Sequence, residues 1–227
     1  MATASKRITR KSLRQPDWFQ VTTEKALEFY QSNQVKVWIA AGSLIALLAG
    51  IAIWQSYKEG QDALAAEEFS RASSLFQLQN YGAAAPAFQK VQAYRWSRYA
   101  ALAHLYEANS YLALNDFDKA ISAAQRFIAA TSADSLYRQI GLVVLATAEE
   151  RKNQCKQAVA HYGEAEKISA PLKDKAILGK ARCAQQIGEI KTALEAYRDY
   201  IKENPDSVLS LQIAELEAKM GAQSVAK

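Results

Sequence analysis

The most apolar stretch of the chain is a run of 21 uncharged residues from Val37 to Tyr57. As a helix rising 1.5 Å per residue, it would extend about 30 Å, the thickness of the hydrocarbon core of a bilayer. Trp38 lies at one end and Trp54 and Tyr57 at the other, as aromatic residues do at membrane interfaces. The 36 residues before it are too many for the usual n-region of a cleaved signal peptide. We therefore expect residues 37–57 to form a retained transmembrane helix.

Beyond this segment, small and apolar residues recur with a period near 36 residues. The repeat is marked by four alanines at intervals of 36, 38 and 35 residues, namely Ala84, Ala120, Ala158 and Ala193. Twelve residues before each of them lies a second alanine, giving Ala72, Ala108, Ala146 and Ala181. Small residues at fixed offsets in a repeat of this length are typical of stacked helix pairs whose helices cross closely. We therefore expect about four helix pairs within residues 58–221.

A final helix is predicted after the fourth pair. Ser207 can cap its N-terminus and Gly221 can end it. Its apolar face would consist of Leu209, Ile213, Leu216 and Met220. A solenoid needs such a helix to cover its last apolar face. The remaining residues, 222–227, are expected to form a disordered tail.

The composition favours a chain built almost wholly of helices. It has 43 alanines but only 9 glycines and 4 prolines, so strong helix formers are abundant and hairpin-turn residues are scarce. The predicted fold class is all-α: one N-terminal transmembrane helix followed by an α-solenoid of about four helix pairs and a capping helix. Residues 1–36 are expected to form a basic tail with a short helix.

The net charge of +5 is concentrated ahead of the apolar segment. Residues 1–36 hold seven Lys or Arg and three Asp or Glu, whereas residues 58–71 hold two and four. The positive-inside rule therefore predicts a cytoplasmic N-terminus and an extracytoplasmic location for residues 58–227. Because the large domain is left nearly neutral, we do not expect it to bind nucleic acid.

The sequence contains no pattern typical of a catalytic, cofactor or metal site. His104 and His161 are the only histidines, and neither lies in metal-ligand spacing. A Gly-rich phosphate loop, a GxSxG elbow and a CxxC pair are all absent from the sequence. We expect a protein that is not an enzyme, with no cofactor, no metal and no small-molecule substrate.

The two cysteines fall at corresponding ends of neighbouring helices. Cys155 is predicted to open the second helix of copy three, and Cys183 to lie late in the first helix of copy four. Antiparallel packing of these helices would bring the two residues together, and an oxidising compartment would permit a disulfide. The alternative is a pair of small buried thiols.

The repeat resembles the tetratricopeptide repeat, most closely in the second copy, over residues 106–121. Pro205 stands where that family ends the second helix of a repeat. Two features depart from the family pattern. Glu149 occupies a position that is aromatic or apolar in the family, so copy three is expected to be splayed. The loop ahead of that copy, around Thr131–Ser135, is expected to be longer than the others.

The resemblance implies a concave peptide groove lined by the first helix of each pair. Carried over copy by copy, the lining residues are Phe69, Ser73, Phe76, Leu102, Leu105, Asn109, Leu112, Ile140, Val143, Thr147, Leu178 and Arg182. Such a groove would suit unfolded or hydrophobic client segments, or one partner helix. The alternative is that these side chains pack against one another or against residues 58–70.

The architecture as a whole resembles the bacterial ancillary subunit of the Sec translocon, a family that includes periplasmic repeat proteins linked to chaperones. At the residue level the similarity lies in Tyr99–Ala108 and in Arg7–Leu13. The resemblance implies an inner-membrane protein whose periplasmic domain binds translocon subunits, chaperones or clients. Within the span, Gly42, Ala46 and Gly50 recur every four residues and would let a partner helix approach closely.

Two other classes of protein fit the same pattern. One is an accessory or scaffold subunit of another bacterial membrane complex, such as a respiratory or division assembly. The other is a receptor of the mitochondrial import type, which also combines an N-terminal anchor with repeats but exposes them to the cytosol.

Overall fold

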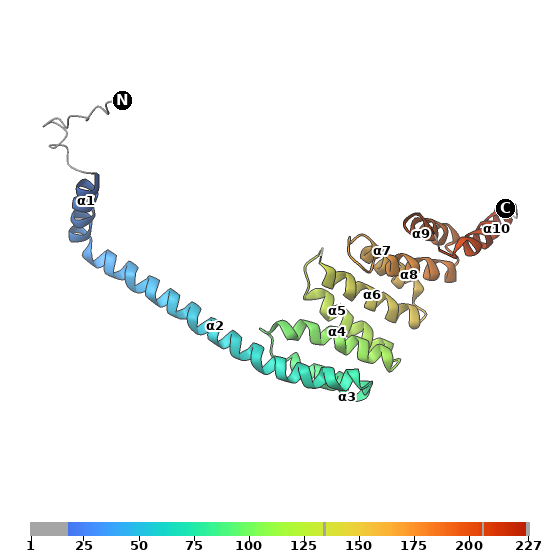
Figure 1. Ribbon diagram of the computed structural model, residues 1–227, viewed down its shortest axis with the longest axis horizontal. Coiled ribbons are helices and arrows are strands. Elements are labelled where there is room, and N and C mark those ends of the chain that lie inside the picture. Colours follow the sequence, from blue (N-terminus) through green and yellow to red (C-terminus); the bar gives the residue numbers. More distant parts are fainter. Residues whose placement is uncertain (1–17, 134, 206, 226–227) are drawn as a thin grey trace, which may run out of the picture. The chain divides into compact units, whose positions relative to one another are not determined.

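The computed structural model describes residues 18–133, 135–205 and 207–225, and within them every regular element is a helix. These described ranges contain ten helices and no strand, and Figure 1 labels the helices in chain order. The chain divides into two compact units, Met1–Tyr57 and Lys58–Lys227. The all-α prediction is therefore confirmed.

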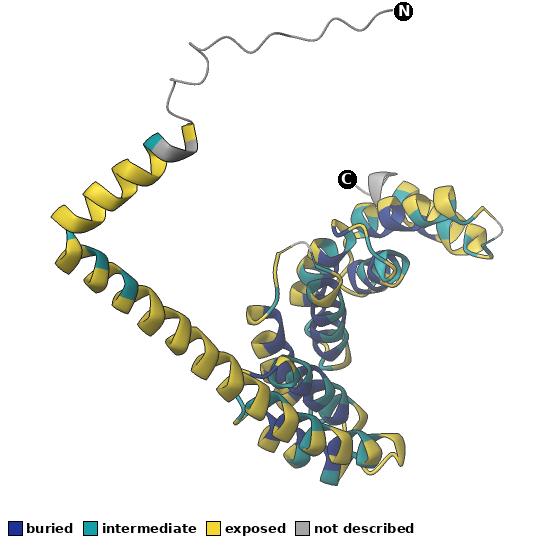
Figure 2. Ribbon diagram, turned by 60° about the vertical axis from the view of Figure 1, so that its left-hand side comes forward, coloured by how far each residue is buried: buried dark blue, intermediate teal, exposed yellow. Residues whose placement is uncertain are grey.

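The first unit consists of α1 (Trp18–Ser32) and the first part of α2 (Gln34–Gln77), separated by a bend at Asn33. By length and composition, α2 is able to cross a membrane, and the apolar stretch that qualifies has none of its residues buried. Figure 2 colours this stretch almost wholly as exposed. The helix continues without interruption past Tyr57, so the predicted span and the first helix of the repeat array form one continuous helix.

The second unit is a stack of antiparallel helix pairs. The end of α2 pairs with α3 (Tyr81–Val91) through a shared apolar cluster. The following pairs are α4 (Arg98–Ala113) with α5 (Phe117–Ala129), α6 (Leu136–Arg151) with α7 (Cys155–Glu166), and α8 (Lys173–Gln186) with α9 (Ile190–Glu203). From α3 to α10 (Ser210–Val225), each helix packs on the next in sequence (Figure 1). The expected solenoid of four pairs and a capping helix is confirmed.

The eight alanines that revealed the repeat are all buried completely between the helices of the array. Each has a relative exposure of 0%: Ala72, Ala84, Ala108, Ala120, Ala146, Ala158, Ala181 and Ala193. A larger side chain at these positions would hold the helix axes apart, because interiors are packed without space for an extra methylene.

The turns inside the four pairs share one backbone conformation. Each is three residues long, and its middle residue has a positive φ of 58° to 80°: Gln79, Asn115, Asn153 and Gly188. The next N–H bonds back to the carbonyl five residues earlier, as Asp116 does to Tyr111 at 2.9 Å, which is the Schellman ending of a helix. These four residues follow the same intervals of 36, 38 and 35 as the alanines.

The expectation of a longer loop around Thr131–Ser135 is wrong. The connections between copies, at residues 92–97, 130–135 and 167–172, each contain six residues. The wider spacing at that point comes from the helix α5, which has 13 residues where α3 has 11. The two additional residues lengthen α5, and the connections on either side of it keep the same length as in the other copies.

The expectation that Glu149 splays copy three is also wrong. Its side chain is buried against α7, where its Oε2 lies 2.7 Å from Nδ1 of His161. A buried carboxylate is tolerated when a hydrogen-bonding partner meets it. The helices α6 and α7 consequently pack as closely as those of the other copies.

The capping helix differs from its prediction at both ends. It begins at Ser210, and Ser207 lies in the preceding turn, where its N–H bonds to Asn204 O. It continues through Gly221 to Val225, so residues 222–225 are helical where a disordered tail was expected, and 226–227 lie outside the described residues. Leu216 is buried and Ile213 and Met220 pack beside it, as predicted, whereas Leu209 packs on the same cluster from the turn just before the helix.

Candidate partner-binding face

Aromatic rings from copies one and two fill the groove predicted at the first copy. The Phe69 ring packs at 5.4 to 5.5 Å from those of Phe88 and Tyr106. The Phe76 ring packs at 5.2 and 5.5 Å from those of Tyr81 and Tyr106. Edge-to-face contacts at these distances are favourable in aromatic pairs. The side chains expected to receive a ligand here therefore form part of the core.

The groove residues on α4 have three different environments. Leu105 is buried, and the Asn109 amide donates a 3.0 Å bond to the Leu105 carbonyl. Leu112 is half-buried. Leu102 lines a cavity of about 350 Å³ that lies between the start of α4, the end of α5 and the start of α6.

The lining of this cavity is mainly apolar at its base. Ala101, Leu102, Phe127 and Ala130 provide its apolar wall, and a rim of hydroxyl-bearing residues and Arg98 surrounds them. Tyr137 on the rim is 53% exposed. The sequence pointed to Leu102 alone, because the other walls come from the end of one copy and the beginning of the next.

The groove residues on α6 and α8 are similarly divided. Val143 is buried in the central core, and Ile140 is half-buried. The Thr147 hydroxyl donates to the Val143 carbonyl at 2.7 Å and lies 3.2 Å from the Tyr162 hydroxyl. Leu178 packs against the C-terminal core. The twelve predicted residues thus do not form one continuous apolar groove, and peptide binding by this face stays a prediction.

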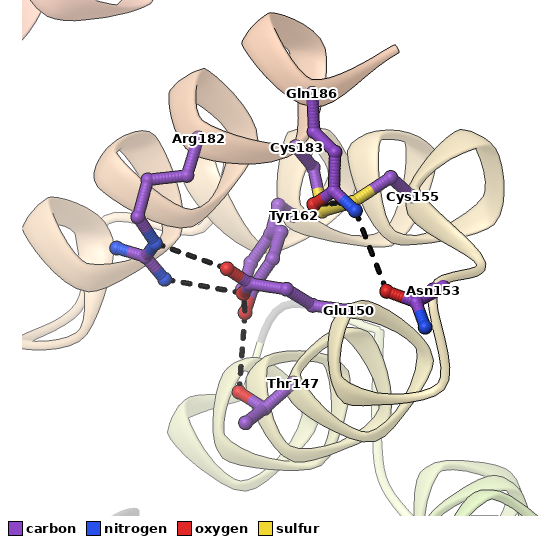
Figure 3. Close-up of a disulfide and its surroundings, with 8 residues drawn as sticks. All are labelled: Thr147, Glu150, Asn153, Cys155, Tyr162, Arg182, Cys183 and Gln186. Carbon is purple, nitrogen blue, oxygen red and sulfur yellow. Dashed lines mark hydrogen bonds and ion pairs between the residues drawn. A yellow bond between two sulfur atoms is a disulfide. The ribbon is translucent and has the colours of Figure 1, made fainter.

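Two groove residues remain: Ser73, which is half-buried, and Arg182, which is engaged by an acidic partner. Its Nε and Nη2 donate to Glu150 at 3.0 and 3.1 Å, and the Tyr162 hydroxyl donates to the same carboxylate at 2.7 Å (Figure 3). Burial raises the pKa of Tyr162, so the phenol stays protonated. Hydrogen bonding to Glu150 raises the pKa of Arg182. The cluster joins α6, α7 and α8 by charge-assisted hydrogen bonds.

A disulfide lies beside this cluster and joins copies three and four. Cys155 and Cys183 are bonded with a Cα–Cα distance of 4.9 Å, and both are buried (Figure 3). On the exposed side, Gln186 donates to Asn153 at 3.4 Å. The Tyr162 ring covers Gly179, where a Cβ atom would collide with it. The boundary between copies three and four is therefore covalently and sterically fixed.

A second buried carboxylate, which sequence reasoning missed, joins copies one and two. Glu107 accepts bonds from Gln89 at 2.8 Å, Gln92 at 2.6 Å and Arg126 at 3.0 Å. Burial alone would raise the pKa of Glu107, but the His104 ring, the two amides and the Arg126 charge together hold it below its ordinary value. Only its position between three helices distinguishes it from an ordinary surface glutamate, and a single sequence does not reveal that position.

The described residues include no group of three or more His, Cys, Asp or Glu side chains that could hold a metal ion. On α2, Gly42, Ala46 and Gly50 are exposed, and a Cβ atom on either glycine would meet nothing within 4 Å. This face of the helix is therefore open for packing, although no partner helix is part of the structure.

Comparison with known proteins defines the class. Residues 27–169 match the profile of the tetratricopeptide repeat-like domain, and residues 175–207 match a further tetratricopeptide repeat. The first match covers more than half of the chain, so this protein belongs to the tetratricopeptide repeat-like domain family. Proteins built from these repeats typically serve as protein-interaction scaffolds.

Similar solved structures share the fold at low sequence identity. The nearly identical TPR-like repeats of a candidate kinesin light chain from Podosopora anserina align with a TM-score of 0.57 at 16% identity, covering 73% of this chain and 90% of that one. A single-substitution variant of those repeats aligns with the same TM-score and coverage at 15% identity. At this identity the likeness concerns the fold alone. No curated protein matches the chain in sequence.

Proposed function

We propose that this protein is a non-enzymatic, membrane-anchored interaction module whose repeat domain holds a partner or client protein near the Sec translocon. One observation carries the proposal: the uncharged segment of α2 continues without a break into the first helix of a tetratricopeptide array. An interaction domain attached in this way would act at the membrane surface. The resemblance to the ancillary translocon subunit supplies the choice of complex.

The anchor would be residues 37–57 in the bacterial inner membrane, with residues 1–36 cytoplasmic and the repeat domain, 58–221, periplasmic. The charge difference across the span supports this orientation, and the Cys155–Cys183 disulfide suits an oxidising compartment. Protease added to spheroplasts should digest the repeat domain and leave an N-terminal tag intact. Protection of the repeat domain would exclude this topology and would favour a cytosol-facing receptor.

The cavity beside Leu102 and Tyr137 is the most suitable part of the array for partner contact. Elsewhere the predicted groove is occupied by rings in copy one and by the Arg182–Glu150 pair in copies three and four. The proposed partners are translocon subunits, periplasmic chaperones or their clients. The Gly42–Gly50 face of α2 would pack against a membrane subunit of the same complex.

Photo-crosslinking in intact cells tests this proposal. A photoreactive amino acid replaces Tyr137, and a second variant carries it at Lys191, an exposed position on α9. We expect translocon subunits or periplasmic chaperones to be recovered from the Tyr137 position and to be depleted at Lys191. Recovery of neither class from membranes that contain the full chain would contradict the association with the translocon.

A scaffold subunit of a respiratory or division complex is the second candidate. The filled groove of copy one and the disulfide between copies three and four favour it, because a closed and braced array suits a spacer better than a client receptor. A fixed ratio of this chain to one enzyme in the purified complex would support the scaffold function. Variable occupancy with unfolded clients would support the first proposal.

A further inference from the structure

Helix α1 separates large apolar side chains from acidic ones. With 3.6 residues per turn, Trp18, Ala26 and Phe29 fall on one side of the helix, and Glu24 and Glu28 fall on the opposite side. Tyr30 lies on the same side as Ala26, and Leu27 lies at the edge of this face, half a turn from Trp18.

The apolar face of α1 is exposed to a degree that is unusual for such side chains. Trp18 is 76%, Phe29 is 63% and Leu27 is 56% exposed. A helix of 15 residues with a continuous face of this kind needs a second apolar phase or a partner to cover it. The composition of the helix favours lipid over a protein partner, since Trp and Tyr are enriched where lipid meets water.

The position of α1 in the chain also indicates lipid. The helix ends at Ser32, and only the bend at Asn33 separates it from α2, whose uncharged segment begins at Val37. Five Lys or Arg residues lie within the first 14 residues of the sequence, directly ahead of the helix. Basic residues beside an amphipathic helix are attracted to anionic headgroups.

We propose that α1 lies in the plane of the cytoplasmic membrane interface, with its apolar face in the boundary between headgroups and acyl chains and with Glu24 and Glu28 in water. This inference rests on the membrane anchoring proposed above. An interfacial helix joined to α2 by a single residue would fix the depth of the anchor in the bilayer. It would also hold the basic tail against the anionic leaflet.

The test compares two neighbouring positions on opposite faces of α1 in the full chain. Ala26→Cys and Glu28→Cys variants are labelled with an environment-sensitive fluorophore, because the disulfide leaves the native cysteines unreactive. Each is reconstituted in vesicles of three parts phosphatidylcholine to one part phosphatidylglycerol, with brominated acyl chains as quenchers. A third label at Leu47→Cys, in the middle of the predicted span, reports the anchor itself.

We expect shallow bromines to quench the label at Ala26 about threefold more than the label at Glu28, because the two side chains would lie on opposite sides of the interface. Deep bromines should quench the label at Leu47. Equal quenching at positions 26 and 28 would overturn the proposal. The proposal would also be overturned if the label at Ala26 were shielded from a water-soluble quencher but not quenched by brominated lipid, because a protein would then cover the apolar face. In either case, quenching of the label at Leu47 by deep bromines would still support the membrane anchor. If that label were not quenched, both the anchor and the interfacial position of α1 would be contradicted.

Discussion

Arg182 on α8 binds Glu150 on α6 through two nitrogens, although the two residues lie 32 positions apart in the sequence. The pair joins copy three to copy four, and the Tyr162 hydroxyl donates to the same carboxylate, which leaves Arg182 already paired on the face predicted to bind a partner. An arginine that sequence reasoning assigned to ligand binding is thus occupied within the protein.

Removing this pair should weaken the repeat domain only slightly. The Arg182 side chain is 53% exposed, and exposed ion pairs contribute about 0.2–1 kcal/mol. We expect Arg182→Ala to lower the free energy of unfolding by about that amount, measured on the full chain in detergent by chemical denaturation. Arg198→Ala is the control, because Arg198 is as exposed as Arg182 but pairs with the more exposed Glu217. A loss several times larger at Arg182 alone would mean that the cluster is coupled to the core.

Gly179→Ala should be strongly destabilising. The added methyl group would collide with the Tyr162 ring, and overpacking of a filled core costs about 1–3 kcal/mol. Gly163→Ala is the control, because it also lies in a helix but its Cβ would meet nothing within 4 Å. It should leave the melting temperature unchanged or raise it, since alanine favours helix by about 0.5–1 kcal/mol over glycine. Equal melting temperatures for the two variants would contradict the packing of Tyr162 over Gly179.

The contact between His161 and Glu149 should make stability depend on pH. The hydrogen bond with Glu149 raises the pKa of His161 above the ordinary histidine value of 6.5, even though burial opposes it. A raised pKa means that the folded protein binds the proton more tightly than the unfolded chain. The stabilisation is therefore complete below about pH 6.5 and is lost as the pH rises through the folded pKa.

Thermal unfolding of the wild type and of His161→Gln measures this effect. Their difference in melting temperature should be largest near about pH 6 and should shrink by about pH 8.5. NMR titration of the two histidines gives the pKa directly. A His161 resonance that titrates below the ordinary histidine value would refute the assignment.

The disulfide should be intact in the protein as isolated. Thiol titration of unreduced, denatured chain should detect no free thiol, because both cysteines are bonded. Closing a loop of this separation, 28 residues, is worth about 3–4 kcal/mol in the chain-entropy account. Reduction, or the double variant Cys155→Ala with Cys183→Ala, should accordingly lower the melting temperature. Two titratable thiols in unreduced protein would disprove the bond.

The sequence specified the helical repeat because its requirements are local. Helices that cross closely need small side chains at the crossing. The regular spacing of the alanines therefore predicts that they are buried, and they are. The turns follow the same intervals, since the position of each turn is fixed relative to its crossing. The length of the uncharged segment and the charges beside it likewise need no knowledge of the rest of the fold.

Only the tertiary structure decided which polar and aromatic side chains meet. The sequence did not single out Glu107, and Glu149 was expected to splay copy three, yet each is buried against partners from other helices. Phe69 and Arg182 were expected to line an open groove. In the structure Phe69 packs against Tyr106 and Arg182 pairs with Glu150, and both partners are distant in sequence. The cavity beside Leu102 has walls from two copies. The period of a repeat gives the register of each helix, but the contact between two side chains depends on the relative placement of helices that the period does not encode.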